Sequence, residues 1–399
     1  MRPDLHPVWQ DRDLRALAAL IVLFGAVVCS FGPYVSLLAV RQFGLGDRGY
    51  AALLVVSTVL SVSASIFVGI RADQTAGRRR IALISCVLML VGVGLMSLWP
   101  MRPVFLLAHA VIFPLASTLF GQFFAQARIA AQAHPPEARD AIMSTIRALF
   151  ALPFVIVLPL WSVAFTAGAS ILMIYPVCLM LALAMFALTW RRWPQDGGKT
   201  GDDRPSGLSF RAALRELAHA PLALRVLALG AVNAAGTVYM ALLGLVLTPE
   251  VGRGTADVAL YAGITAGLEV PFMLAMPLVI GRIARTKLIL IGAVIYSTHV
   301  IALPLLAGSP LLWLMTLPAA IGGAITLTLP IAYLQDLLAA RPGTGASLMA
   351  LQKLLGDGLA AACFVLGAGL SGYGLVGLMG GVVAILGAAA LHIADARRG

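Results

Sequence analysis

Residues 14–40 read LRALAALIVLFGAVVCSFGPYVSLLAV, with Arg15 as the charged residue of the run. About 20 consecutive apolar residues are enough for a helix to cross a bilayer, and this run is longer. The residues before it, Met1 to Asp13, are polar and lack the pattern of a signal peptide. We therefore expect residues 14–40 to form an uncleaved membrane-spanning helix.

The composition extends this expectation to the whole chain. Its 399 residues are 60% hydrophobic and 11% charged, with a mean hydropathy of +0.96, whereas soluble domains carry about 25% charged residues. Apolar runs of about 20 residues recur about twelve times, which predicts an all-α polytopic membrane protein. The expected spans are 14–40, 48–71, 80–99, 104–127, 139–166, 168–190, 222–247, 256–282, 285–307, 310–337, 344–370 and 371–395.

The longest polar segment begins after residue 190 and divides the spans into two groups of about six. Within it, Phe210, Leu214 and Leu217 share one helical face, which predicts a short amphipathic surface helix. A solvated connector with incidental periodicity is the alternative. The expected parts are an N-terminal six-helix bundle at 1–190, a cytoplasmic linker at 191–221 and a C-terminal six-helix bundle at 222–399.

The positions of the basic residues predict the orientation. With the N-terminus placed in the cytoplasm, the outer loops hold only Arg41, Arg48, Arg102 and Arg253 of the 28 lysines and arginines. This bias fits the positive-inside rule and predicts cytoplasmic termini. Arginine outnumbers lysine 25 to 3, which indicates a bacterium with a GC-rich genome and hence its inner (plasma) membrane. The net charge of +11 is then explained by basic flanks that face anionic lipid, so a nucleic-acid partner is not expected.

Ionisable side chains lie inside the predicted spans at Arg147, Glu269, Lys353 and Asp357. A charged group in hydrocarbon costs at least roughly 2.5 kcal/mol, so it stays where it lines a pathway or meets a partner. Sequence features of an enzyme are missing: the chain has no Walker loop, no metal-spaced His or Cys set and no nucleophile beside a plausible base. The pattern predicts a membrane transporter without metal or cofactor.

Each of these positions has more than one interpretation. Arg147 lies about two turns into its span, so it would either point inward as a donor or extend to the membrane surface. Glu269 follows Gly263 and Gly267 and suits a proton carrier, an acceptor for hydroxyl groups or a structural hydrogen bond. Lys353 and Asp357 are one helical turn apart and can pair, but Lys353 could instead face Glu269.

The two halves of the chain share a weak repeat. The second span ends in VGIRAD (68–73) and the eighth in IGRIAR (280–285), so a glycine followed by cations occupies equivalent places. Such repeats are typical of transporters whose substrate site lies between the halves, near the middle of the membrane.

The loop after the second span holds Arg71, Asp73, Gly77, Arg79 and Arg80, and this region resembles the major facilitator superfamily. Asp73 and Gly77 are one residue further apart than in the common pattern, as in the sugar efflux transporter branch. The chain is similar to that branch also at 32–37, 122–128, 139–147, 265–271, 335–337 and 343–346. It departs from proton-coupled drug exporters, because the fifth span lacks their glycines around Pro153 and Pro159.

The resemblance implies a secondary active transporter of two pseudo-repeated bundles that exports sugars or sugar-like molecules by alternating access. Proton antiport through Glu269 is expected, with the proton gradient as the driving force. The resemblance also implies that the loop forms a conformational latch; a topology anchor is the alternative. The gating candidates are Arg71, Asp73, Arg79, Arg80 and Asp336. The substrate- or proton-binding candidates are Arg147, Glu269, Lys353, Asp357, Gln122, Gln126, Asn233, Tyr239, Tyr34 and Gln352.

Two other functions stay open. An exporter of drugs or other amphipathic compounds on the same scaffold is the main alternative, and a transport-like membrane sensor is more remote. A cavity rich in Tyr, Gln and charge would favour sugars, because sugars need many hydroxyl partners. One dominated by Phe and Met would favour amphipathic compounds. The expected partners are a small molecule and lipid, and a monomer is expected.

Overall fold

The computed structural model describes residues 7–75, 77–194, 220–280, 282–337 and 342–396. Over these residues the chain is built of α-helices with short 3-10 and π segments, and no β-strand is present. Twelve helices of the described part are long and apolar enough to cross a membrane. The predicted class, an all-α polytopic membrane protein with twelve spans, is confirmed.

The spans follow the predicted ranges closely, and several consist of more than one helical segment. The first half holds α1 (Pro7–Gln10), α2 (Arg12–Phe31) with η1 (Gly32–Tyr34), α3 (Val35–Leu37) and η2 (Leu38–Gln42), α4 (Gly46–Thr75), α5 (Arg78–Leu98), α6 (Arg102–Leu107) with η3 (Ala108–Ile112), α7 (Phe113–Ala116) and α8 (Thr118–Ala131), α9 (Pro136–Thr166), and η4 (Ile171–Met173) with α10 (Ile174–Arg192). The second half holds α12 (Ala220–Leu245) with η5 (Val246–Glu250), α13 (Thr255–Val279), α14 (Arg285–Leu306), η6 (Pro310–Met315) with α15 (Thr316–Leu337), α16 (Pro342–Leu370) and α17 (Tyr373–Ala396).

Prolines account for the interrupted spans. Pro33 lies in η1, Pro114 is the second residue after η3, and Pro249 lies in η5. Proline has no backbone N–H, and its ring clashes with the carbonyl four residues earlier, so the regular hydrogen-bond ladder shifts at these points. The first and fourth spans continue as helix beyond η1 and η3, and the seventh span ends with η5.

Backbone contacts divide the chain into two compact units. The first unit comprises Met1–Phe31, Ser63–Val157 and Ser170–Ser209, and the second comprises Gly32–Val62, Leu158–Ala169 and Phe210–Gly399. The second unit therefore includes parts of the first six spans. The division at 191–221 stays a prediction, because most of that linker, including the surface helix expected after Leu208, lies outside the described residues.

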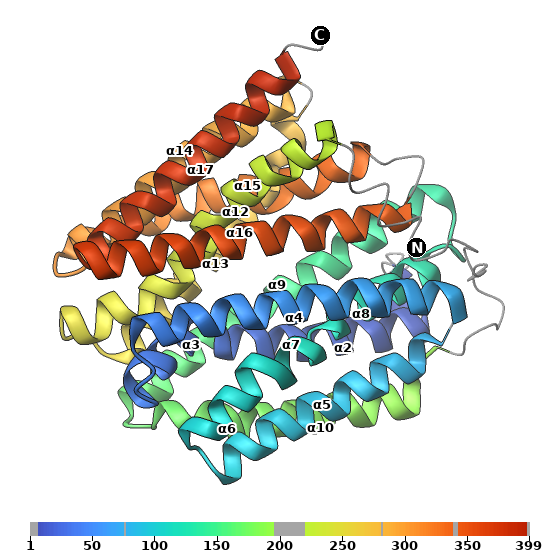
Figure 1. Cartoon of the computed structure of the whole chain (residues 1–399). Helices are drawn as coiled ribbons and strands as arrows, with labels where there is room; N and C mark the ends of the chain where they lie inside the picture. The colour runs from blue at the N-terminus through green and yellow to red at the C-terminus, as the bar shows by residue number, and fades with distance from the viewer. Residues whose placement is uncertain (1–6, 76, 195–219, 281, 338–341, 397–399) are drawn as a thin grey trace, which may run out of the picture. The chain divides into compact units, whose positions relative to one another are not determined.

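In the first unit, α5 and α10 lie side by side, and α2 packs on α8 and α10 (Figure 1). Gly25 of α2 allows a close approach to α9, since a Cβ atom there would lie 2.6 Å from the carbonyl oxygen of Phe150. Membrane helices associate through such close packing at small residues, because lipid provides no hydrophobic drive between them.

In the second unit, α14 and α17 lie side by side, and α12 packs against α16 and α17 (Figure 1). Glycine again permits the contacts. A Cβ atom on Gly387 of α17 would lie 2.6 Å from the carbonyl oxygen of Ala228 on α12, and one on Gly377 would lie 2.8 Å from that of Val300 on α14. Several of the polar residues described below lie on α12 and α16 of this group.

Candidate functional site

Asp357 on α16 is almost fully buried, with 1% of its surface exposed. Its carboxylate accepts hydrogen bonds from Thr237 of α12 at 2.7 Å and from Thr58 of α4 at 2.8 Å. Lys353, one turn earlier on α16, donates to the same carboxylate at 2.5 Å. Of the two partners considered for Lys353, the structure places Asp357 in contact with it.

Two other predicted site residues lie at the same α12–α16 interface. Asn233 of α12 packs closely on Gly356 of α16. A Cβ atom added to Gly356 would lie 2.8 Å from Nδ2 of Asn233. Gln352 of α16 is buried, and its Nε2 donates to the carbonyl of Leu229 at 3.5 Å. The fold thus gathers four of the predicted polar residues along two facing helices.

Glu269 lies in the middle of α13 and is half-buried. It interacts electrostatically with the side chains of Tyr239 on α12 and Tyr296 on α14. A Cβ atom on Gly323 of α15 would overlap Oε1 of Glu269. The carboxylate is therefore directed toward α12, α14 and α15 of its own unit.

Two buried hydroxyl groups lie beside Glu269. They are Oη of Tyr239 and Oγ1 of Thr265, one turn before Glu269 on α13, and these two hydroxyls interact with each other. A carboxylate and two hydroxyls together can bind the hydroxyl groups of a ligand or pass a proton.

Tyr34 is arranged differently from the other candidates. It is fully buried, and its hydroxyl donates to the carbonyl of Thr255 at 3.2 Å. Its ring packs edge-on against Phe165 at a centroid distance of 5.5 Å. In this structure the side chain joins α13 to the first span, and its hydroxyl is engaged with the backbone.

The candidates of the first unit are Gln122 and Gln126 on α8 and Arg147 on α9. Both glutamines are buried, and the Oε1 atom of each has no hydrogen-bond partner in the described part of the chain. Arg147 is exposed, and no hydrogen bond or ion pair is found for it among the described residues. These side chains stay candidates for ligand contacts.

Close to these glutamines in the sequence is a cluster of phenylalanines that joins three helices. Phe24 of α2 lies 6.3 Å from both Phe120 of α8 and Phe150 of α9, measured between ring centroids. Phe120 also lies 4.6 Å from Phe124, and 40% of its surface is exposed. The first unit therefore holds both buried amides and partly exposed aromatic surface.

The gating candidates after the second span are on helices. We expected a loop there, but α4 continues to Thr75 and carries Arg71 and Asp73, so that expectation was wrong. A glycine-free run of helix-compatible residues extends the span to that point. Nothing is described for the side chains of Asp73 and Asp336, which lie outside the described part.

Arg79 makes a defined contact at the start of α5. Its guanidinium donates to the carbonyl of Trp190, in the last turn of α10, at 2.8 Å and lies over the indole ring. This is the capping of free helix-end carbonyls that a cation can provide. The neighbouring Arg80 is exposed. Whether these arginines act as a latch stays a prediction.

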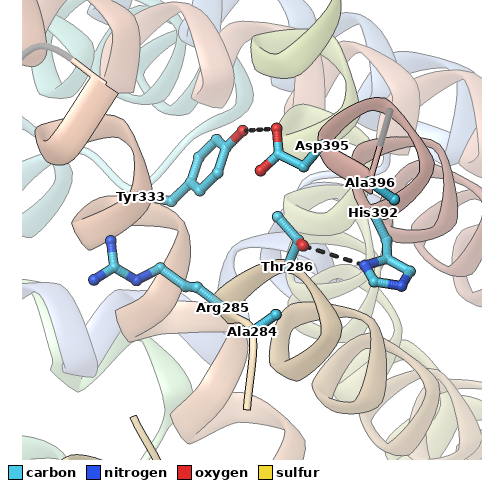
Figure 2. A pocket seen from close by; sticks show the side chains of 7 residues that line it. All are labelled: Ala284, Arg285, Thr286, Tyr333, His392, Asp395 and Ala396. Atoms are coloured by element: carbon cyan, nitrogen blue, oxygen red, sulfur yellow. Dashed lines mark hydrogen bonds between the residues drawn. The ribbon is translucent and has the colours of Figure 1, made fainter. Parts of the chain in front are cut away.

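A surface cavity of about 530 Å³ lies at the ends of α14, α15 and α17 (Figure 2). Its carboxylate, Asp395, is already engaged: Arg225 of α12 donates to it at 2.8 and 3.1 Å, and Tyr333 at 2.9 Å. On the opposite wall, Thr286 and His392 are hydrogen-bonded at 3.2 Å. The cavity is separate from Glu269 and Asp357, and its polar groups join helix ends.

Several residues that complete these clusters were not predicted. They are Thr58, Thr237, Thr265 and Gly323. Neutral hydroxyls and glycines are common in membrane helices, so nothing in the sequence separates them from ordinary packing residues. The pair Gly322 and Gly323 is the one available signal, because adjacent glycines within a span indicate close helix contact.

The fold and the intramembrane polar clusters define a membrane transporter. Residues 15–361 match the Major Facilitator Superfamily. The chain belongs to that superfamily, whose members are transporters and not enzymes.

Similar proteins agree with this assignment. A protein of Deinococcus radiodurans, which its name assigns provisionally to sugar efflux transporters, is 26% identical over 86% of this chain and 87% of its own length. A mutant of the nucleoside transporter NupG superimposes with a TM-score of 0.74 at 14% identity, covering 96% of this chain and 100% of that one. A D-xylose-proton symporter gives 0.69 at 16% identity, covering 94% and 96%. The two structural matches show the same fold.

Proposed function

We propose that this protein exports sugars or sugar-like molecules by alternating access, in exchange for protons, with Glu269 as a proton carrier. The observation that carries the proposal is the group of Glu269, Tyr239 and Thr265. It combines a carboxylate within a membrane span with two buried hydroxyls that lie next to each other and close to that carboxylate. Such a group suits hydroxyl recognition and proton transfer.

The similar proteins support the substrate class. The Deinococcus protein carries the name of a sugar efflux transporter, and two of the structural neighbours transport a nucleoside or D-xylose according to their titles. All three substrate types carry several hydroxyl groups. Asn233 and Gln352 of the same unit add amides that can donate to and accept from such groups. The distribution of its basic residues supports a placement with both termini in the cytoplasm. A monomer in a bacterial inner membrane is part of the same proposal.

The phenylalanine cluster favours a second candidate. Phe24, Phe120, Phe124 and Phe150 offer aromatic surface that would suit an amphipathic or drug-like compound. The polar group around Glu269 lies in the other unit, and it is the reason that sugars are placed first.

The test is transport by purified protein in liposomes. Radiolabelled lactose and a glucose analogue are offered with and without an imposed pH gradient, and wild type is compared with E269Q. Gradient-driven sugar movement that E269Q loses, while gradient-independent exchange persists, is the expected result. E250Q is the matched control, because Glu250 is exposed at the end of η5. Transport of a dye or drug without sugar movement would establish the second candidate instead.

A further inference from the structure

Two surface cavities share a wall at the start of α14. The cavity of Figure 2, of about 530 Å³, lies at the ends of α14, α15 and α17, and a second cavity of about 370 Å³ lies beside the connection from α13 to α14. Ala284 and Arg285 line both cavities. Sites for small molecules commonly have about 300–1,000 Å³. Each cavity can therefore hold part of a ligand, and one ligand can reach both.

The cavities lie at the depth of lipid head groups. α14, α15 and α17 belong to three of the candidate membrane spans, and the first cavity is lined where α14 begins and where α15 and α17 end. Apolar side chains near the cavities face outward, since Leu278 of α13 is 69% exposed and Ile393 of α17 is 52% exposed. In a membrane protein such surface contacts lipid, so a lipid molecule can enter the cavities from the side.

The two cavities differ in their chemistry. The first is lined mostly by polar side chains, those of Arg285, Thr286, Tyr333, His392 and Asp395. The second is lined mostly by apolar side chains, those of Ile280, Ile283, Ala284 and Leu288. A polar cavity that adjoins an apolar one fits a molecule with a polar head and an apolar chain, because each part meets surface of its own kind.

Asp395 offers one carboxylate oxygen to a ligand. Arg225 and Tyr333 donate to this carboxylate, and the donors found for it among the described residues all reach Oδ1. Figure 2 shows the other oxygen, Oδ2, directed away from Tyr333. Arg225 already balances the charge of Asp395. Oδ2 therefore suits a neutral donor, such as a hydroxyl group, better than a second cation.

Arg285 and Thr286 offer donors to an anion. A guanidinium has five N–H donors, so Arg285 can bind a phosphate group while it keeps another acceptor. Thr286 is buried, and its hydroxyl is hydrogen-bonded to Nδ1 of His392 at 3.2 Å. When Nδ1 carries the proton, His392 donates to Thr286, and the hydroxyl hydrogen of Thr286 is available to a phosphate oxygen. A charged donor and a neutral donor thus lie in neighbouring positions.

We propose that the two cavities bind an anionic phospholipid whose head group carries hydroxyls, as that of phosphatidylglycerol does. Arg285 and Thr286 hold the phosphate, a head-group hydroxyl donates to Oδ2 of Asp395, and an acyl chain lies against Ile283 and Leu288. The predicted orientation places the site in the cytoplasmic leaflet, which is rich in anionic lipid. The site does not depend on which substrate the protein transports.

The first test measures lipid binding to the purified, delipidated full chain by native mass spectrometry. Phosphatidylglycerol and phosphatidylethanolamine with the same acyl chains are compared. R285Q should weaken binding of phosphatidylglycerol by about tenfold, the effect of one lost hydrogen bond to a charged group. Phosphatidylethanolamine should bind more weakly to the wild type, and R285Q should change its binding little. Equal binding of the two lipids by the wild type would overturn the proposal.

The matched control is K287Q. Lys287 is exposed, lies two residues from Arg285 and is not among the described residues that line either cavity. K287Q removes the same charge, so it should bind phosphatidylglycerol as the wild type does. An equal loss in R285Q and K287Q would show general attraction to a basic surface and would reject the site.

A second pair of variants keeps the test valid if R285Q does not fold. T286V removes the buried hydroxyl and should weaken binding of phosphatidylglycerol by about fivefold, the effect of one neutral hydrogen bond. T286S keeps the hydroxyl and should bind like the wild type. The melting temperature without lipid identifies any variant that is misfolded. Folded T286V that binds phosphatidylglycerol as tightly as T286S would contradict the proposal.

The third test separates a lipid from a free phosphate compound. Glycerol phosphate and inorganic phosphate are added as competitors at the concentration of the lipid. Neither should displace phosphatidylglycerol, because neither has an acyl chain for the second cavity. Displacement by either compound would indicate a site for free phosphate and would overturn the assignment to lipid. Sugar transport is not measured in these experiments, so failure of the proposed function would leave their outcome unchanged.

Discussion

Gly323 of α15 leaves open the space that the carboxylate of Glu269 on α13 occupies, since a Cβ atom at position 323 would overlap Oε1. The preceding Gly322 has a similar part, because a Cβ atom there would lie 2.5 Å from the backbone nitrogen of Tyr296 on α14. The position of Glu269 is therefore set by three helices that meet closely around it.

Replacing Gly323 should impair transport more than stability. In G323A the new methyl displaces the Glu269 carboxylate, and misplacing a functional group by about 1 Å can cost on the order of a hundredfold in rate. Transport in liposomes measures the effect. G369A is the control, because a Cβ atom on Gly369 of α16 meets nothing within 4 Å. Equal transport by both variants would show that the placement of Glu269 is unimportant.

Two arginines at the start of α5 should differ in effect. Arg79 binds the carbonyl of Trp190 and lies over its ring, whereas no such contact is found for Arg80 in the described part of the chain. If the basic run forms a latch, R79Q should slow transport at normal expression, and R80Q should have little effect. Similar behaviour of the two variants, with altered membrane orientation, would instead support a topology anchor.

The cluster at Asp395 should contribute to stability. R225Q removes two hydrogen bonds and leaves a partly buried carboxylate without its cation, so we expect a loss of about 1–2 kcal/mol, allowing for solvent screening. Y333F removes one hydrogen bond and should cost about 0.5–1 kcal/mol. Thermal unfolding in detergent checks both values. A larger loss in Y333F than in R225Q would contradict this ranking.

Gln122 and Phe124 should separate the two candidate substrates. Q122L removes a buried amide whose oxygen has no partner in the described structure. If that amide binds sugar, the KM for sugar should rise about tenfold, as the loss of one good hydrogen bond implies. If the amide has only a structural role, Q122L should leave the KM unchanged. F124A should reduce export of an amphipathic dye if the phenylalanine cluster binds such compounds.

Gly25 should be essential for packing in the first unit. In G25A the added methyl meets the carbonyl oxygen of Phe150, so overpacking should cost about 1–3 kcal/mol. A lower apparent Tm in detergent is the expected result. G121A is the control from α8, where a Cβ atom has nothing within 4 Å. An unchanged Tm for G25A would show that α2 and α9 can move apart without cost.

Much of the fold was predictable because the lipid environment constrains the sequence directly. A helix that crosses the membrane needs a long apolar run, and those runs predicted the twelve spans within a few residues of where they lie. The end of α4 was misjudged, since polar residues such as Arg71 leave the membrane without ending the helix. Hydropathy indicates which residues lie in lipid, whereas a helix ends where its backbone hydrogen bonds end, so the two boundaries can differ.

The candidate site was predictable only in part. Glu269 and Asp357 are visible in the sequence because charge inside a span is costly. Their partners Thr58, Thr237 and Gly323 are not, because hydroxyl residues and glycines carry no such cost and occur throughout the spans. Tyr34 was predicted beside them on its polarity, yet its hydroxyl is bound to the backbone of Thr255.

By itself, the sequence determined that this chain is a twelve-span membrane protein and which of its spans carry charge, since both follow from the cost of transferring side chains into lipid. Only the tertiary structure decided that Lys353 pairs with Asp357, that Thr58 completes the same site across the two halves, and that Gly323 admits Glu269. These relations join residues up to 299 positions apart. They depend on which helices pack together, and helix packing is decided by short-range shape complementarity that no single span contains.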